Sequence, residues 1–296
     1  MNNSHDYRIA GLVLRSEIDI VATGIRGFKP FVVEGGADNA DCTFGIRAER
    51  EKEDYGNRSI ISTSYLAEAD ADSYLAKVED GYLYVIERKD DARREALFHI
   101  NTSTNAIESN LECHTLNDVS LLRFGIWIMF GIVLAPKQAI AIHSSVIESS
   151  GRGTLFLGES GTGKSTHTRL WRENIEGARL LNDDSPIVRI VDGEARVFGS
   201  PWSGKTPCYK SLDYPIAGFC RLSQAPHNAI RRLNTIAAIG ALLPSCPPQF
   251  AHDEYLQDCI CSTLGTMLKS VPVYHLECLP DAAAAELSHS TIVGHE

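Results

Sequence analysis

Residues 158–165 combine glycines, a lysine and a serine at a spacing that suits phosphate binding. The segment fits the pattern G-x-x-x-x-G-K-[ST] at every fixed position. The glycines let the backbone curl so that several N–H groups point at one phosphate chain. In such loops the lysine reaches the β- and γ-phosphates of a nucleotide, and the serine ligates Mg²⁺. The predicted nucleotide-binding residues are Gly158, Glu159, Ser160, Gly161, Thr162, Gly163, Lys164, Ser165 and Thr166.

Two adjacent carboxylates, Asp183 and Asp184, follow an apolar run and lie 19 and 20 residues after Lys164. In phosphate-loop proteins an acidic residue at a neighbouring strand end reaches the metal. Two adjacent carboxylates can share metal ligation and proton acceptance. The alternative is an ordinary turn, because Asp-Asp-Ser-Pro is rich in turn-forming residues. Together with the loop, the pair predicts a metal site formed by Ser165, Asp183 and Asp184.

A phosphate loop needs a strand before it and a helix after it. The apolar residues 154–157 suit a short buried strand, and a helix is expected over about 166–173. A further strand is expected over 138–148, and a hairpin over 187–198 around Asp192-Gly193. Helices and strands alternate over the remainder. The fold class expected is therefore α/β, with a mixed sheet and helices around it.

The first third of the chain has a different pattern and no catalytic constellation. Strand-like segments occur over 8–20 and 42–47, and hairpins are expected over 77–86 and 97–111. We therefore expect two domains. Residues 1–114 would form a small β-rich domain, and residues 115–296 the phosphate-loop domain.

The apolar run 119–135 has two interpretations. It is shorter than the roughly 20 apolar residues of a spanning helix and carries Arg123 near its start. Thr115 with Asp118 resembles a capping box, and Pro136 ends the pattern. We predict a buried helix, with a membrane segment as the alternative.

Composition restricts the class of protein. The 296 residues are 44% hydrophobic, with 28 basic and 38 acidic side chains and a net charge of −10. This balance disfavours a general nucleic-acid coat, which needs a basic surface. The polar first six residues lack a signal pattern, and the eight scattered cysteines contain no CxxC pair. We expect a cytoplasmic protein that binds neither nucleic acid nor membrane.

The motifs together resemble the C-terminal kinase domain of the HPr kinase/phosphorylase family. That family has a histidine 21 residues before the loop lysine, and His143 precedes Lys164 by the same interval. GESGTGKS is similar to the family's GDSGxGKS, and LLNDD to its LVADD. The resemblance covers about residues 136–200. ATP-using phosphoenolpyruvate carboxykinases share this phosphate-loop fold.

The resemblance implies a role for each matching residue. Lys164 would bind phosphate, Ser165 would ligate Mg²⁺, and Asp184 would accept the proton of the attacking hydroxyl. Asp183 would support Asp184 or touch the metal. His143 would lie beside the γ-phosphate and orient the acidic pair; a structural strand histidine is the alternative. Family members also commonly assemble into rings, so a homo-oligomer is implied.

One segment departs from the family. The family's second acidic metal ligand lies in a segment like EIRGLG, whereas residues 199–205 read GSPWSGK and contain no carboxylate. Lys205 offers a charge for phosphate, and Trp202 could pack over a base or substrate. An ordinary loop with a buried tryptophan is the alternative.

These observations predict an ATP- and Mg²⁺-dependent kinase that phosphorylates a hydroxyl, with serine in a protein or peptide as the expected acceptor. Two alternatives stay open. One is a kinase for a free amino acid, hydroxy acid or sugar. The other is a regulator whose nucleotide site senses and does not transfer, although the intact pair Asp183-Asp184 argues against it. The sequence does not identify the acceptor.

Overall fold

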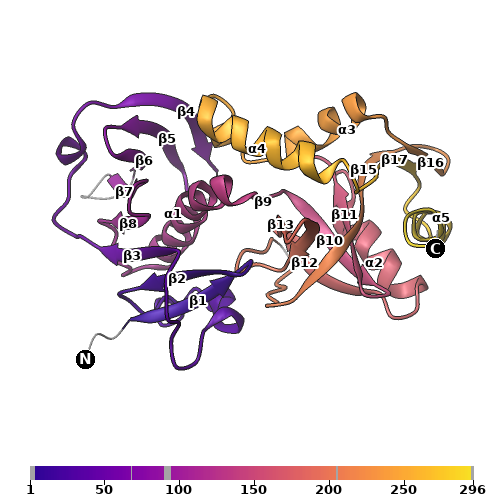
Figure 1. Ribbon diagram of the computed structural model, residues 1–296, viewed down its shortest axis with the longest axis horizontal. Coiled ribbons are helices and arrows are strands. Elements are labelled where there is room, and N and C mark those ends of the chain that lie inside the picture. Colours follow the sequence, from indigo (N-terminus) through magenta and orange to yellow (C-terminus); the bar gives the residue numbers. More distant parts are fainter. Residues whose placement is uncertain (1–3, 68, 90–94, 205, 295–296) are drawn as a thin grey trace. The chain divides into compact units, whose positions relative to one another are not determined.

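The computed structural model describes residues 4–67, 69–89, 95–204 and 206–294 (Figure 1). The chain divides into two compact units, each with a sheet of its own. Unit 1 comprises residues 1–136 and 249–257, and unit 2 comprises residues 137–248 and 258–296. The predicted boundary at 114/115 is therefore wrong: 115–136 and 249–257 belong to unit 1.

Unit 1 is built on an eight-stranded sheet in the order β1-β2-β3-β8-β7-β6-β5-β4. β3 pairs in parallel with β2 and β8, and the remaining neighbours are antiparallel. The expected β-rich character and both expected hairpins, β5–β6 and β7–β8, are confirmed. The strands are His5–Ile9 (β1), Leu12–Ser16 (β2), Cys42–Ile46 (β3), Ser59–Leu66 (β4), Ala71–Val78 (β5), Gly81–Arg88 (β6), Glu95–Asn101 (β7) and Ala106–Ser109 (β8).

Helix α1 (Leu116–Leu134) packs on β6 and β7, which explains why it belongs to unit 1. A Cβ atom on Gly125 would lie 2.3 Å from the ring of Phe98, so glycine is needed for this close approach. At the start of the helix, Arg88 forms an ion pair of 2.7 Å with Asp118. The predicted capping box between Thr115 and Asp118 is present. By length and composition α1 could cross a membrane, but 67% of its apolar window is buried within the protein, in agreement with the buried helix we expected.

Unit 2 is built on a nine-stranded mixed sheet in the order β12-β10-β11-β15-β14-β13-β9, extended by β17 and β16 next to β15. The long strand β15 joins two parts of the sheet: it pairs antiparallel with β14 and parallel with β11 and β17. The strands are Ala139–Ala141 (β9), Ser144–Ser149 (β10), Arg152–Leu157 (β11), Arg179–Asp184 (β12), Ile187–Val191 (β13), Glu194–Phe198 (β14), Asp213–Gln224 (β15), Ala229–Arg232 (β16) and Val273–Cys278 (β17).

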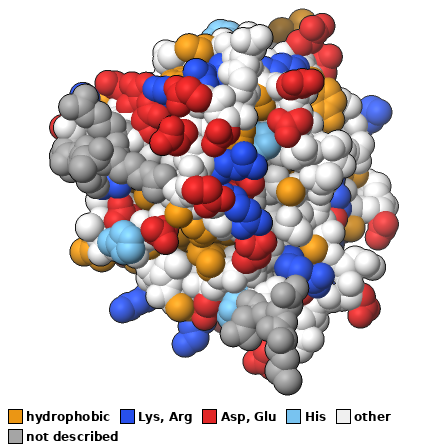
Figure 2. Space-filling model, turned by 90° about the vertical axis from the view of Figure 1, so that its left-hand side faces the viewer, with side chains coloured by type: hydrophobic (Ala, Val, Ile, Leu, Met, Phe, Trp, Pro, Cys, Tyr) orange, Lys and Arg blue, Asp and Glu red, His pale blue; other side chains and the backbone are white. Residues whose placement is uncertain are grey.

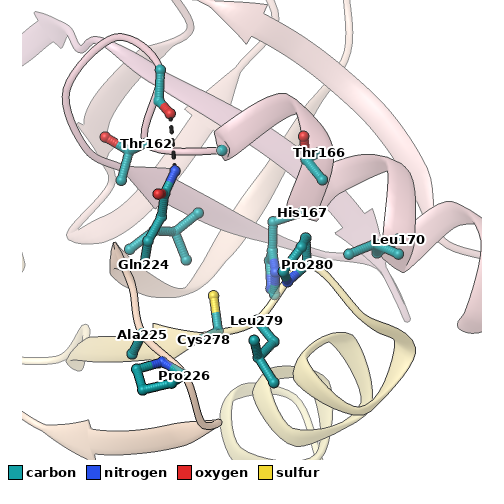
Figure 3. A pocket seen from close by; sticks show the side chains of 13 residues that line it. Thr162, Thr166, His167, Leu170, Gln224, Ala225, Pro226, Cys278, Leu279 and Pro280 are labelled. Atoms are coloured by element: carbon teal, nitrogen blue, oxygen red, sulfur yellow. Dashed lines mark hydrogen bonds between the residues drawn. The ribbon is translucent and has the colours of Figure 1, made fainter.

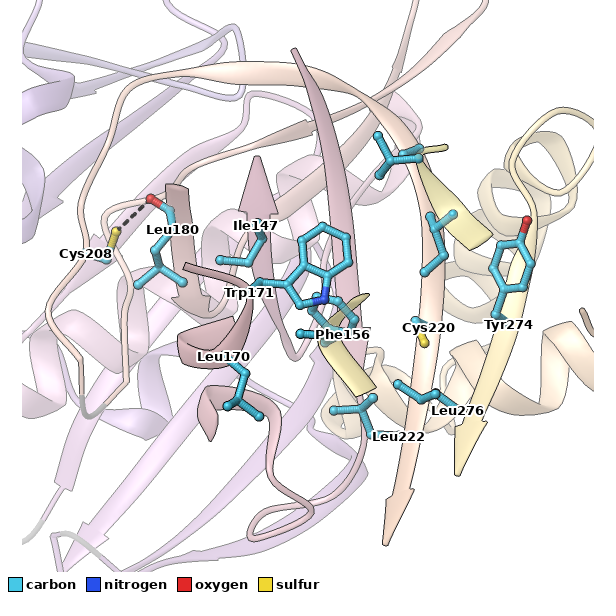
Figure 4. Close-up of a cluster of buried hydrophobic side chains, with 14 residues drawn as sticks. Ile147, Phe156, Leu170, Trp171, Leu180, Cys208, Cys220, Leu222, Tyr274 and Leu276 are labelled. Carbon is cyan, nitrogen blue, oxygen red and sulfur yellow. Dashed lines mark hydrogen bonds between the residues drawn. The ribbon is translucent and has the colours of Figure 1, made fainter. Parts of the chain in front are cut away.

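Helices α2 and α5 cover one face of this sheet and enclose its core (Figure 4). Trp171 of α2 is fully buried. Its ring packs edge-on against that of Phe156 of β11, with the two ring centroids 5.3 Å apart. Leu276 of β17 and Ile292 of α5 belong to the same cluster. The remaining helices of the chain are Lys164–Asn174 (α2), Thr235–Leu242 (α3), Glu254–Met267 (α4) and Ala282–Ile292 (α5), and the first four residues of α4 belong to unit 1.

Two segments expected as single strands are each divided. Residues 8–20 contribute to a hairpin, β1–β2, which turns at Ala10 and Gly11, both with positive φ. Residues 138–148 form β9 and β10, separated by Ile142 and His143. Because β9 pairs with β13 whereas β10 pairs with β11 and β12, the chain must bend at His143 to change partners.

Charged side chains of both signs share the face of the molecule shown in Figure 2. Acidic side chains gather at its upper left, with Lys and Arg scattered among them. The mixture agrees with the excess of acidic over basic residues. The described part of this face therefore offers a polyanion no continuous basic surface.

Candidate functional site

The glycine-rich loop 158–163 connects β11 to α2. Gly158, Gly161 and Gly163 have φ values of 149°, 83° and 108°, a region that residues with a Cβ rarely adopt. Gly163 is the N-cap of α2 and provides no side-chain cap. The first N–H groups of α2 are thus left for another acceptor, and a helix N-terminus favours an anion there.

Lys164, the first residue of α2, lies folded against the loop. Its Nζ donates to the carbonyl oxygens of Gly158 and Glu159, at 2.7 and 3.2 Å. Burial lowers the pKa of Lys164, the carboxylates of Asp184 and Asp183 oppose this shift, and the positive charge of Arg221 adds to it. The ammonium therefore lies near two carboxylates and a second cation. The charges of Lys164 and Arg221 would attract a phosphate group, whereas the carboxylates would repel it unless a cation neutralised them.

Ser165 and Asp183 meet between α2 and the end of β12. The Ser165 hydroxyl lies 3.3 Å from each carboxylate oxygen of Asp183. Asp183 is buried, and its strand pairs with β10 so that Asp183 lies opposite Ser145. Hydroxyl and carboxylate oxygens are ligands that Mg²⁺ prefers, so this pair could hold the ion.

The next residue of β12, Asp184, faces His143. Their closest atoms, His143 Nδ1 and Asp184 Oδ1, are 3.8 Å apart, and both side chains are nearly half exposed. Burial lowers the pKa of His143, the charge of Lys164 adds to this effect, and Asp184 and Asp183 oppose it. The imidazole is therefore neutral near pH 7, and it can hydrogen-bond without cancelling the charge of Asp184.

The segment 199–204 holds the acidic pair in place. Gly204 N–H and the Ser203 hydroxyl both donate to the carbonyl oxygen of Asp183, at 2.7 and 3.1 Å. Ser203 also forms an isolated bridge with Asp184. The buried amide of Asn182 donates to the carbonyl oxygen of Trp202 at 3.0 Å. These contacts fix the backbone of the acidic pair without using a charged side chain.

The same segment corrects one expectation. Trp202 is only 4% exposed, so it packs inside the protein and cannot cover a base or substrate. Lys205 lies outside the described residues, and its predicted contact with phosphate stays a prediction.

A pocket of about 580 Å³ opens beside the loop (Figure 3). Thr162, Thr166 and Leu170 line it on one side, and Leu222, Gln224 and Cys278 on the other. The Gln224 amide donates to the carbonyl oxygen of Gly161 at 3.3 Å, which links β15 to the loop. Its size and its mixed apolar and polar lining suit a small organic group next to the phosphate site.

The structure brings His143, Lys164, Ser165, Asp183 and Asp184 to one edge of the sheet of unit 2. In the sequence, Cys220-Arg221 and Arg231-Arg232 are candidate contacts to phosphate or substrate, with plain surface as the alternative, and Gln224 is not a candidate. Arg221 and Gln224 both lie on β15, and only its parallel pairing with β11 carries them to the loop. A local motif contains no signal for that pairing.

Comparisons with known proteins add little. No family profile and no curated protein matches the sequence. Among solved structures, the chain is similar to the Hpr(Ser) kinase/phosphatase from Coxiella burnetii, with a TM-score of 0.29 and 11% identity over 52% of this chain and 93% of that one. A likeness at this level carries no conclusion about activity, so the residues of the site must supply it.

Proposed function

We propose that unit 2 is a cytoplasmic ATP- and Mg²⁺-dependent kinase that transfers the γ-phosphoryl group to a hydroxyl, with serine of a protein or peptide as the expected acceptor. One observation carries the proposal. The serine that follows the loop lysine contacts Asp183, while the next residue, Asp184, faces His143. Loop, metal-ligand pair and proton acceptor thus occur in one place, as phosphoryl transfer requires.

The donor set suits Mg²⁺ in particular. Among the described residues, no group of three or more His, Cys, Asp and Glu side chains is arranged to hold a metal ion by itself. Mg²⁺ is commonly held by one or two carboxylates together with waters and substrate phosphates. Ser165 and Asp183 would hold it here. When bound, Mg²⁺ neutralises charge on the phosphate oxygens.

The residues of the chain would share the remaining work. The loop N–H groups and Lys164 bind the phosphates, and Lys164 exchanges its carbonyl partners for phosphate oxygens. The pocket beside the loop receives the nucleoside. Asp184 takes the proton of the acceptor hydroxyl while that oxygen bonds to the γ-phosphorus and the bond to the β–γ bridging oxygen breaks. Neutral His143 orients Asp184.

The first prediction tests nucleotide binding. Mg·ATP should raise the melting temperature, because a ligand at 100 times its Kd stabilises the folded state by about 2.7 kcal/mol. Lys164→Ala should remove most of this gain, because it deletes the cation that faces the phosphates. Lys269→Ala changes an exposed lysine of the same unit and should keep the full gain. A wild-type melting curve that does not move with millimolar Mg·ATP would refute the proposal.

A further inference from the structure

Three basic side chains lie side by side across β15, β17 and β16. Arg221 pairs with His275 in the parallel register, and His275 pairs with Arg231 in the antiparallel register, so all three share one face. Arg231 Nη2 lies 3.4 Å from His275 Nδ1, and His275 Nε2 lies 2.8 Å from the Ser223 hydroxyl. Arg231 is exposed and the other two are partly exposed. We refer to Arg221, His275 and Arg231 as the cationic row, after its two guanidinium groups.

The row begins at the phosphate loop. Arg221 pairs with Leu157, the last residue of β11 before the loop, and its guanidinium lies 3.8 Å from Glu159. Its charge also acts on Lys164, whose pKa it helps to lower. The positive charges of Arg221 and Lys164 repel each other. An anion bound between or beside them would offset this repulsion.

Arg221 lies on the face of the sheet opposite the nucleoside pocket. Its neighbours Cys220 and Leu222 point into the core under α2 and α5, so the alternation of the strand turns Arg221 the other way. Arg221 Nη1 donates to the carbonyl oxygen of Ala241 at 3.4 Å, and the His143 N–H donates to that of Ser245 at 2.7 Å. Ala241 and Ser245 are four residues apart in one continuous helical segment. Their carbonyl groups are therefore separated by about 6 Å along the helix axis. Arg221 therefore lies on the same side as His143.

Two carboxylates lie close to the row and limit where an anion can bind. Glu159 is 87% exposed, and its contact with Arg221 at 3.8 Å is of the solvated kind that contributes little. Glu277 follows His275 by two residues on the same face, next to Ser223. An anion would therefore bind at Arg221, the member of the row next to the phosphate loop, away from Glu277. Guanidinium groups suit this because they bind carboxylate and phosphate through two parallel hydrogen bonds.

We infer that the phosphate acceptor carries an anionic group, a carboxylate or a phosphate, which Arg221 binds while the acceptor hydroxyl lies at Asp184. The inference rests on the proposed function and specifies its substrate class. Nucleoside and acceptor would approach the phosphate loop from opposite faces of the sheet.

The test compares acceptors with and without an anionic group. The small pairs are glycerate or glycerol 3-phosphate against glycerol, and the peptide pair is a serine flanked by aspartates against one flanked by asparagines. The measurement is the release of ADP from Mg·ATP. We expect the KM for the acceptor to be at least tenfold lower for the charged member of each pair. Comparing the small-molecule pairs with the peptide pair identifies which kind of acceptor carries the anion. Arg221→Gln should raise that KM five- to tenfold. Arg232→Gln, the same change at an exposed arginine of β16, two strands further from the loop, should alter it less than twofold. Equal KM values within the pairs, or equal effects of both variants, would overturn the inference.

A binding measurement removes the dependence on turnover. Glycerol 3-phosphate, added to protein loaded with Mg²⁺ and a non-hydrolysable ATP analogue, should shift the His275 imidazole NMR signal saturably. The shift should persist in Arg232→Gln, disappear in Arg221→Gln and be absent with glycerol. No saturable shift in the wild type overturns the inference even if a kinase activity is found. Failure to bind nucleotide by calorimetry refutes the proposed function instead, and the same titration of the nucleotide-free protein still decides the inference.

Discussion

Asp184 has a backbone conformation that residues with a side chain rarely adopt. Its φ is 124°, and its Cβ lies close to Gly204, where an added Cβ would be 3.1 Å away. The bridge to Ser203 and the hydrogen bond from Gly204 to Asp183 keep the chain in this state. Such strain persists only where surrounding contacts enforce it, and it clusters at functional sites. The conformation directs the Asp184 carboxylate away from the buried Asp183 and towards His143.

The two carboxylates should therefore respond differently to loss of charge. A base is needed only when the hydroxyl attacks, so Asp184→Asn should keep Mg·ATP affinity near normal and reduce turnover about 10²-fold or more. Asn has nearly the same shape as Asp, so the backbone conformation should be preserved. Asp183→Asn should mainly raise the Mg²⁺ concentration that is required, because this carboxylate contacts Ser165. Calorimetry and phosphate transfer, measured on each variant, check this. Transfer that survives both changes would exclude the mechanism, and tight ATP binding without transfer to any acceptor would favour a sensor.

His143 should act on transfer and not on nucleotide binding. His143→Ala should keep ATP affinity within about tenfold, about 1.4 kcal/mol, while slowing transfer. The pKa of His143 lies below its ordinary 6.5, so the active neutral form persists at pH 7 and is lost as the pH falls through that lowered pKa. The wild-type rate should thus decline only below pH 6.5, and the variant should lack the part of the decline due to His143. Identical rate–pH profiles would assign His143 to structure alone.

At the scale of elements, α2 docks on α5 through a buried polar contact. The Ser288 hydroxyl donates to the carbonyl oxygen of Ala285 and accepts from Trp171 Nε1 at 2.8 Å. His167 Nε2, 2.9 Å from the same hydroxyl, must therefore carry the proton. Burial lowers the pKa of His167 to about 4. The helix that begins at the phosphate loop is thus held by a histidine that has to stay neutral.

This contact predicts a pH-dependent stability. The unfolded chain binds a proton at His167 below its ordinary pKa of 6.5, whereas the folded protein does so only near 4, so stability is lost as the pH falls between these values. At pH 5.5 the loss should be about 1.4 kcal/mol relative to pH 7.5. Denaturant unfolding at both pH values should show this difference in the wild type and a smaller one in His167→Gln. His227→Gln, an exposed control, should resemble the wild type; an unchanged pH dependence in His167→Gln would refute the assignment.

Local signals predicted the elements of the site better than their pairing. The glycines and Lys164 specify a loop that leads into a helix, and the capping box specifies the start of α1. The break at His143 could not be predicted, because it arises from a change of partner strands. The place of Arg221 depends on the register between β11 and β15, which are more than fifty residues apart. Periodicity describes one strand and contains no information on its neighbour.

At the scale of the whole molecule, the sequence likewise did not predict that residues 249–257 belong to unit 1. The Tyr82 hydroxyl donates to the buried carboxylate of Asp253 at 2.9 Å, and the Ser62 hydroxyl donates to the carbonyl oxygen of Gln249 at 3.0 Å. Phe250 packs at Gly131 of α1, where a Cβ would lie 3.1 Å from its ring. Each contact joins residues more than one hundred positions apart. Composition changes along the chain therefore misplaced the boundary, although they distinguished a β-rich part from a mixed one.

Because the chain forms two compact units, each with its own sheet, we expect two unfolding transitions, and two perturbations can test this. Tyr82→Phe removes a hydrogen bond to the buried carboxylate of Asp253 and should destabilise unit 1 by about 1.5–3 kcal/mol. Tyr65→Phe removes an exposed hydrogen bond to Asp70 and should lower the free energy of unfolding by less than about 0.5 kcal/mol.

Mg·ATP should stabilise only the unit that binds it, unit 2. Calorimetric scans should therefore show two transitions, one lowered by Tyr82→Phe and the other raised by Mg·ATP. A single transition moved by both would show that the units unfold as one cooperative block, since cooperative blocks gain and lose stability as a whole.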